Sequence, residues 1–342
     1  MKKYGRELVL GSVAVSVLVL FSLVLLPALL VWVCPEGQEP PGLSSETTEA
    51  PQAAVKVFRH ESGEVESIPL EEYVMGVVAG EMPAAFEPEA LKAQAVAART
   101  YAISRMRRSG AGNPAAHPAA PLCDDIHCQV YRTASQLREL KGDSWMGEGY
   151  KRIGEAVAAT AGQVMYYKGA LVEQPLFHSS SGGQTANSED VFTTALPYLR
   201  SVDSPYEKED PHQEETVSVS LKTFGAKIKS VYPGAGAIGA GNIKVTARSQ
   251  GGRVQTLQAG KAKVSGRRIR ALFGLRSANF TVKVSDENVL FTTSGYGHGV
   301  GMSQYGANGM AKAGYGYVDI LSHYYSGVEV RVIAEADTAG LS

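Results

Sequence analysis

The apolar positions on either side of Gly80 recur at helical spacing and predict two helices. Residues 70–79 have apolar side chains every third or fourth position, which is typical of a short amphipathic helix that Gly80 ends. Pro88 and the alanine- and leucine-rich run after it predict a longer helix that reaches about Arg107. Glu81 is therefore expected in a joint between two rigid elements.

Shorter patterns predict further hairpins and helices. Alternating residues predict strands at 55–59, 65–68, 163–167, 170–177, 279–284 and 288–292, and a pair of strands around 249–252. Helical patterns are found at 150–161, 221–229 and 265–274, and the glycine-rich C-terminal part predicts two more short helices and a final strand. The mixture predicts an α+β fold. We expect one domain over residues 55–335, with about 214–292 as a second lobe.

The N-terminus predicts a membrane anchor. A basic hexapeptide precedes residues 8–33, which contain no charged residue and are long enough to cross a bilayer of about 30 Å. The positive-inside rule then leaves residues 1–33 as a cytoplasmic tail and signal anchor of a single-pass protein of the cell membrane. Residues 34–54 lack apolar side chains to bury and predict a disordered linker, and 336–342 a short tail. The domain itself is expected outside the cytoplasm.

Composition and charge limit the classes of partner. The chain is 44% hydrophobic and 20% charged, as in folded proteins, and its formal net charge of −1 gives no argument for a nucleic-acid partner. The basic run at 261–270 indicates either a solvated face or a contact with a polyanionic cell wall.

Glu81 is the candidate catalytic acid. Gly80, Met82 and small alanines surround it in the sequence, and a carboxyl in such an apolar corner has a raised pKa, so that it can donate a proton near neutral pH. The alternative is a solvated glutamate at a helix end.

Four metal-ligand side chains lie within a short proline-rich segment. They are His117, Cys123, His127 and Cys128. Two imidazoles and two thiolates form a ligand set that tetrahedral zinc prefers, and four protein ligands leave no open position, so the zinc would be structural. A disulfide between the two cysteines and free thiols remain the alternatives, since the domain is expected in an oxidising compartment.

Two polar loops offer hydrogen-bonding groups for a sugar. The sequence around Ser180 lacks the G-x-S-x-G pattern of a serine hydrolase, and the loop around His298 lacks the lysine of a phosphate-binding loop. The candidate substrate-binding residues in these loops are Ser180, Gln184, His298, Gln304 and Tyr305. The alternative for the loop around His298 is a purely structural tight turn followed by a capped helix.

Three sequence blocks resemble the stage II sporulation protein D family. They are LEEYVMGVVAGEMP with KAQAVAARTYA, HSSSGGQTANSEDVF with PYLRSVDSP, and GYGHGVGMSQYGANGMAKAGYGYVDILSHYYSGVEV. The resemblance spans about residues 55–333 and keeps the order of the blocks. Some members of that family bind zinc at the position of the His/Cys loop.

The resemblance implies a lytic transglycosylase that acts on peptidoglycan during engulfment in sporulation. The substrate would be glycan strands without stem peptides, and the partners a sporulation amidase and a membrane scaffold protein. Glu81 matches the family's catalytic glutamate, and no cofactor is required for the chemistry. The family also includes amidase enhancers, so the alternative is a non-catalytic wall-binding protein that raises the activity of a partner amidase.

Overall fold

The computed structural model describes residues 53–338. The predicted membrane span at 8–33, nearly all of the predicted linker and residues 339–342 lie outside them. Among the helices formed by residues 53–338, none is long and apolar enough to cross a bilayer.

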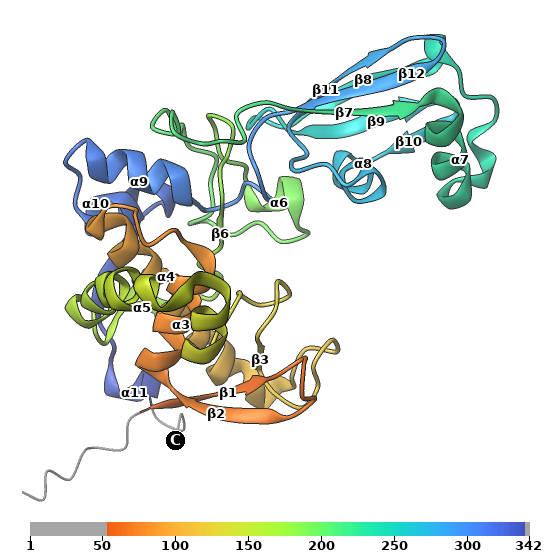
Figure 1. The fold of residues 1–342 in the computed structure, drawn as a ribbon. Helices are drawn as coiled ribbons and strands as arrows, with labels where there is room; N and C mark the ends of the chain where they lie inside the picture. The colour runs from red at the N-terminus through yellow and green to blue at the C-terminus, as the bar shows by residue number, and fades with distance from the viewer. Residues whose placement is uncertain (1–52, 339–342) are drawn as a thin grey trace, which may run out of the picture. The chain divides into compact units, whose positions relative to one another are not determined.

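A hairpin and two helices open the described part of the chain (Figure 1). The hairpin strands β1 (Ala54–Phe58) and β2 (Val65–Pro69) pair antiparallel, and the chain passes directly from β2 into α3 (Leu70–Glu81). After a short connection follows α4 (Pro88–Arg108), with Pro88 in the first turn, where its missing N–H is not needed. These four elements are predicted correctly from the sequence.

The end of α3 corrects the sequence prediction. Gly80 does not end the helix, which includes Glu81 and is capped by Met82 in an extended conformation. Glu81 therefore lies in the last helical turn rather than in a joint. Position 80 requires glycine because the backbone passes close to Val130: a Cβ on Gly80 would lie 2.7 Å from the Val130 carbonyl oxygen.

The helix predicted at 150–161 is much longer in the structure. α5 (Ala134–Ala159) begins after Thr133, whose hydroxyl accepts a hydrogen bond from the Gln136 N–H while the Gln136 side chain accepts one from the Thr133 N–H. Gly142, with φ of 84°, interrupts it. The first half was missed because it has few apolar positions, although the Thr-x-x-Gln capping pattern marks its start.

The helix α4 lies at the centre of the larger hydrophobic core. It contacts α3 and α5 on one side, and β4 (Gln163–Tyr167), α9 (Gln304–Lys312) and α10 (Tyr317–Tyr324) on others. Alanines along α4 are fully buried, which allows several elements to approach it closely. β4 is the middle strand of a sheet with β14 (Val328–Val332) and β5 (Ala170–Leu171).

The predicted strand at 170–177 is wrong over residues 172–176. β5 ends at Leu171, and Pro175, which cannot donate to a strand ladder, follows in the same segment. The chain then forms β6 (Phe177–His178), which pairs in parallel with β13 (Met302–Ser303). This pairing joins the two polar loops of the predicted sugar site.

Residues 215–293 form an inserted segment with a hydrophobic core of its own. Its aromatic centre includes Phe224, Phe273 and Phe291, all buried. One sheet has the order β11-β12-β7 and the other β10-β9-β8. The elements are β7 (Glu215–Ser220), α7 (Leu221–Val231), β8 (Ile243–Arg248), β9 (Val254–Ala259), β10 (Ala262–Val264), α8 (Gly266–Phe273), β11 (Phe280–Val284) and β12 (Asn288–Thr293).

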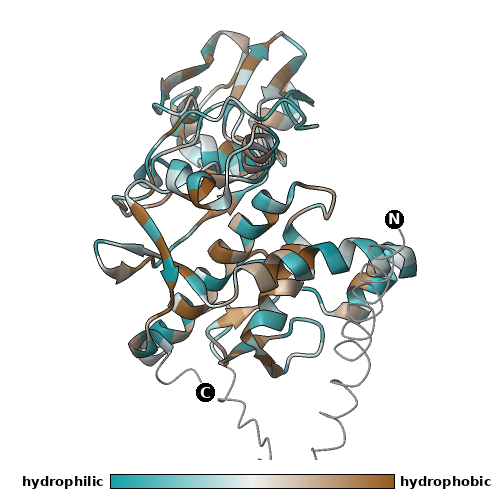
Figure 2. Cartoon of the chain, turned by 90° about the vertical axis from the view of Figure 1, so that its left-hand side faces the viewer, coloured by the Kyte–Doolittle hydropathy of each residue, from teal (hydrophilic) through white to brown (hydrophobic). Residues whose placement is uncertain are grey.

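The fold class is α+β, as predicted. Figure 2 shows hydrophobic and hydrophilic residues mixed along both helices and strands. Two short helices were not predicted, α6 (Ser188–Val191) and α11 (Glu335–Thr338). α11 packs on the larger core through Asp337, which accepts a hydrogen bond of 2.6 Å from the Tyr166 hydroxyl.

Candidate functional site

Glu81 lies where two cavities meet. One cavity has a volume of about 620 Å³, and its lining includes Glu81, Gln304 and His298. The other has a volume of about 940 Å³, and its lining includes Glu81, Trp145 and Arg152. A carboxyl that lines both is accessible to an extended ligand from two sides. We call the first the Gln304 cavity and the second the Trp145 cavity.

The Glu81 carboxyl is fixed by one hydrogen bond and is half-buried. The backbone N–H of Val130 donates to its Oε1 at 2.7 Å. The close approach of Gly80 to the Val130 carbonyl brings this amide within reach. One carboxylate oxygen is thus held by the protein, and the side-chain amide of Gln304 lies close enough to the carboxyl to affect its pKa.

Burial raises the pKa of Glu81. The removal of water from the carboxyl is the largest cause and favours the protonated form. The Val130 N–H, the side-chain amide of Gln304 and the positive charge of Arg132 act in the opposite direction but do not cancel it. The structure therefore supports a carboxyl that holds its proton to higher pH than an exposed glutamate does.

Two of the five predicted sugar-binding residues share a cavity with Glu81. Gln304 is 6% exposed, and its Nε2 has no hydrogen-bond partner among the described residues. His298 is neutral, because burial and the charges of Arg253 and Arg270 lower its pKa to about 4. Its Nδ1 accepts a hydrogen bond of 3.0 Å from the Val300 N–H.

The other three predicted sugar-binding residues line neither cavity. Ser180 is 1% exposed, and its hydroxyl accepts a hydrogen bond from the Tyr296 N–H. The carbonyl of Gln184 accepts a hydrogen bond from Arg253, and the ring of Tyr305 packs edge-on against Phe86. These side chains support the loops.

Sequence reasoning missed His178 as a residue of the Gln304 cavity. Its Nδ1 lies 3.2 Å from the Val300 carbonyl and so carries the proton, which makes the unpartnered, buried Nε2 an acceptor. A donor on Gln304 and an acceptor on His178 therefore lie buried at the wall of this cavity without a partner among the described residues. In the sequence His178 directly precedes a run of serines, but no pattern distinguished this histidine from its neighbours.

Sequence reasoning also missed Glu207, which organises the polar loops. It is 7% exposed and accepts hydrogen bonds from the N–H groups of three consecutive residues and from three serine hydroxyls. These donors are Ser181 N and Oγ, Gly182 N, Gly183 N, Ser204 Oγ and Ser303 Oγ. Ser303 is the N-cap of α9 and directly precedes Gln304. The charged run around Glu207 gives no sign of burial in the sequence.

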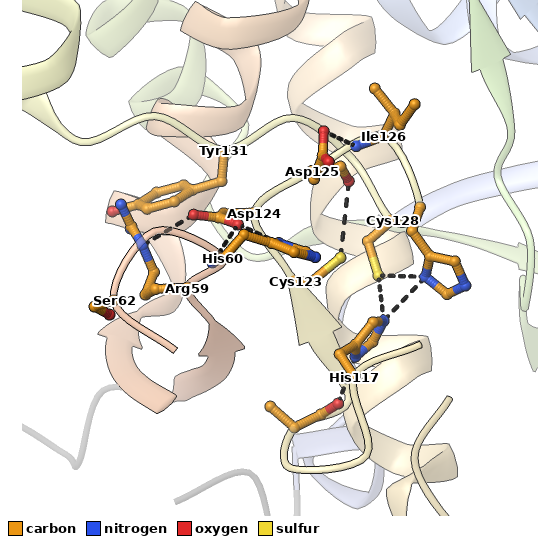
Figure 3. Close-up of polar contacts among 12 residues, drawn as sticks. Arg59, His60, Ser62, His117, Cys123, Asp124, Asp125, Ile126, Cys128 and Tyr131 are labelled. Carbon is orange, nitrogen blue, oxygen red and sulfur yellow. Dashed lines mark hydrogen bonds and ion pairs between the residues drawn. The ribbon is translucent and has the colours of Figure 1, made fainter. Parts of the chain in front are cut away.

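The four predicted metal ligands come together in one cluster (Figure 3). One ligand atom from each of His117, Cys123, His127 and Cys128 lies within 4.8 Å of all the others. The two cysteines are not joined in a disulfide. Nδ1 of His117 lies 2.8 Å from the Ala120 carbonyl and carries the proton, which leaves Nε2 free to coordinate. This donor set and its spacing fit a tetrahedral zinc ion.

Neighbouring polar residues brace the strand that carries Cys123. Asp124 accepts a hydrogen bond of 2.8 Å from His60 Nδ1 and forms an ion pair of 3.1 Å with Arg59 (Figure 3). The Asp124 contact raises the pKa of His60. These contacts attach the cluster to the β1–β2 hairpin, which leads directly into α3.

Comparison with known proteins identifies the family of this chain. Residues 59–167 match the family model described as "SpoIID: Stage II sporulation protein". The chain is 43% identical over 302 residues to stage II sporulation protein D of Bacillus amyloliquefaciens, with 88% of this chain and 84% of the relative covered. The chain belongs to the stage II sporulation protein D family.

Two further relatives come from Bacillus subtilis strain 168. Stage II sporulation protein D of that strain is 41% identical over 300 residues, which cover 87% of this chain and 84% of the relative. A protein named amidase enhancer is 29% identical over 305 residues, which cover 74% of this chain but 39% of that protein. Membership of the family associates this chain with sporulation.

Proposed function

We propose that this protein is a lytic transglycosylase of the sporulating cell. It would cleave peptide-stripped peptidoglycan strands between N-acetylmuramic acid and N-acetylglucosamine during engulfment. The observation that supports this most strongly is Glu81, a carboxyl of raised pKa that lines both cavities. A glycan strand that follows the two cavities passes directly over this acid.

One carboxyl is sufficient for this reaction. Protonated Glu81 gives its proton to the glycosidic oxygen as the bond from that oxygen to C1 of the muramic residue breaks. The 6-hydroxyl oxygen of the same muramic residue bonds to C1 and closes a 1,6-anhydro ring. The hydroxyl proton passes to the Glu81 carboxylate, which restores the acid, and no water is consumed.

The buried polar groups of the Gln304 cavity would orient the sugar. Gln304 Nε2 offers a donor and His178 Nε2 an acceptor, and neither has another partner among the described residues. A sugar hydroxyl or N-acetyl group satisfies both kinds of atom, and an unsatisfied buried polar group costs about 1–3 kcal/mol. Ligand binding thus relieves a cost that the free site carries.

We propose a structural role for zinc. His117, Cys123, His127 and Cys128 would hold it, and four protein ligands leave no position for a substrate. The metal would stabilise the segment that ends at Val130, whose amide holds Glu81. The chemistry of glycan cleavage needs no contribution from it.

The proposed location is the outer face of the cell membrane. Residues 8–33 would anchor the domain, and the glycan strands of the wall would be reached from there. The proposed partners are an amidase that removes stem peptides beforehand and a membrane scaffold protein of the engulfment complex.

The alternative is a non-catalytic enhancer of an amidase. The similarity to a protein named amidase enhancer favours it. In that case the domain would bind glycan without breaking it.

The two functions are separated by product analysis. The full-length protein in detergent is incubated with peptide-stripped glycan, and mass spectrometry detects ends that carry 1,6-anhydromuramic acid. Glu81→Gln should abolish these ends while glycan binding remains. Glu148→Gln is the matched control, because Glu148 is an exposed carboxylate that lines the Trp145 cavity. Activity that depends on Glu148, with reducing ends as products, would indicate hydrolysis; binding without cleavage would favour the enhancer.

A further inference from the structure

The inserted segment contributes a cation to the Gln304 cavity. Arg270 lies in the last turn of α8 and lines this cavity with Glu81. The lining also contains the candidate zinc ligand Cys128, and burial lowers the pKa of His178 and His298 and keeps both imidazoles neutral. Arg270 is therefore the one cation among the described residues that line this cavity. Glu81 and Arg270 lie on helices that pack into different hydrophobic cores.

Arg270 is incompletely partnered within the protein. Its Nε donates a hydrogen bond of 3.2 Å to the Leu275 carbonyl, and the two Nη groups donate none among residues 53–338. It forms no ion pair with an acidic residue of the same range. The side chain is half-buried, so the charge is partly removed from water without a counter-ion, and burial lowers its pKa. Such an arrangement leaves a planar fork of donors for a ligand.

Neighbouring arginines have other roles. Arg253 is 3% exposed, and its guanidinium donates to the backbone carbonyls of Ser181, Gln184 and Gly251. Arg268 is exposed on the same helix as Arg270 and lines neither cavity. Within this basic run, the contact with the Gln304 cavity is therefore specific to Arg270.

A guanidinium fork matches a carboxylate, with which it forms two parallel hydrogen bonds. In a glycan of N-acetylated sugars the lactyl group of muramic acid carries the carboxylate. While a stem peptide is attached, that group is an amide and has no charge. Removal of the peptide exposes the anion.

We infer that Arg270 binds the lactyl carboxylate of muramic acid and thereby selects peptide-stripped strands. This inference rests on the proposed function, since it names the lactyl carboxylate as the group of the glycan that the site recognises. Arg270 is a binding and specificity residue, whereas Glu81 carries the chemistry. The inserted segment thus determines which strands bind, and Glu81, on a helix of the larger hydrophobic core, cleaves them.

The kinetic test compares two glycans that differ in charge. One is the peptide-stripped strand, and the other is the same strand with its lactyl carboxylates converted to methylamides. Arg270→Gln should raise KM for the charged strand by about 10- to 100-fold, as expected for loss of a charged hydrogen-bonded pair, and leave KM for the methylamide strand unchanged. Arg270→Lys should fall between, because it keeps the charge and loses the fork. Arg268→Gln, which removes the same charge from the same helix, should match the unmodified protein.

A binding test gives an answer that does not depend on turnover. Titration calorimetry with full-length protein carrying Glu81→Gln measures affinity for both strands, with and without Arg270→Gln. A loss confined to the charged strand supports the inference. An equal loss on both strands, or no loss on either, overturns it and leaves Arg270 as a residue that shapes the cavity. If the charged strand binds through Arg270 but anhydro ends never form, the proposed transglycosylase fails and the assignment of Arg270 stands.

Discussion

The backbone N–H of Val130 donates a hydrogen bond of 2.7 Å to Oε1 of Glu81. Val130 follows Cys128, the last of the four clustered metal ligands, by two residues. The segment that a metal would order is therefore the one that orients the acid. Stability of the His/Cys cluster and activity of Glu81 are expected to change together.

Metal removal tests this connection. A chelator should lower the thermal midpoint by roughly 5 °C or more and reduce glycan cleavage in parallel, and added zinc should restore both. Cys128→Ala should lose the bound metal in elemental analysis, whereas Cys34→Ala, which leaves the four candidate ligands unchanged, should keep one zinc per chain. A chelated protein with an unchanged midpoint and lost activity would point instead to a catalytic metal.

The dependence of cleavage on pH follows from the pKa of Glu81. The proposed reaction needs the protonated acid, so kcat/KM should fall as pH rises through the raised pKa. Arg132 lowers this pKa, so Arg132→Gln should move the fall to higher pH, and Arg132→Lys should leave it in place. A pH–rate profile of each variant provides the measurement. Movement to lower pH would contradict the assignment of Glu81.

The same shift predicts a pH-dependent effect on stability. The folded protein holds the Glu81 proton more tightly than the unfolded chain, so this contribution is complete below the ordinary pKa of about 4.3 and is lost as pH rises through the raised value. The side chain of Glu81→Gln does not ionise, so the variant does not lose this contribution to stability as pH rises. Urea unfolding should therefore give similar midpoints for Glu81→Gln and the unmodified protein near pH 4, and a higher midpoint for the variant at neutral pH. A difference in urea midpoint between the two proteins that stays constant with pH would show that the pKa of Glu81 is not raised by folding.

A methyl group at Gly80 should displace the segment that holds Glu81. In Gly80→Ala the new Cβ would lie 2.7 Å from the Val130 carbonyl, so the unfolding free energy should fall by about 1–3 kcal/mol and cleavage should weaken. Gly147→Ala is the control, because nothing lies within 4 Å of its Cβ. That change should stabilise α5 by about 0.5–1 kcal/mol and leave cleavage unaffected. Equal unfolding free energies and equal cleavage rates for Gly80→Ala and Gly147→Ala would show that the close approach of Gly80 to Val130 is unimportant.

Removing the charge of Glu207 should loosen the polar loops. In Glu207→Gln an NH₂ group replaces one acceptor oxygen and meets N–H donors, so we expect a loss of about 3 kcal/mol or more in unfolding free energy. Because Ser303 begins α9, glycan binding through Gln304 should weaken as well. Glu209→Gln, which breaks an exposed ion pair with Lys312, should cost less than about 1 kcal/mol. Equal unfolding curves for the two variants would show that the Glu207 bonds contribute little.

Local patterns predicted most elements and part of the site. Helix α8 begins after Ser265, whose hydroxyl caps it, and ends at Gly274 in the left-handed conformation, because both signals act within one or two turns. The four candidate metal ligands were visible because they occupy one short segment. Ser180 was predicted to bind sugar but is buried, since its type and loop position do not reveal how its backbone pairs with Tyr296.

The sequence by itself predicted the candidate acid and the candidate metal ligands, and it determined the order of most helices and strands and the family. Each of these depends on residue type, short-range spacing or similarity along the chain. Tertiary structure alone decided that Val130 holds Glu81, that Glu207 collects donors from three loops and that Arg270 enters the Gln304 cavity. The reason is physical: these contacts join segments that are distant in the chain, and packing of two hydrophobic cores, not local preference, brings them together.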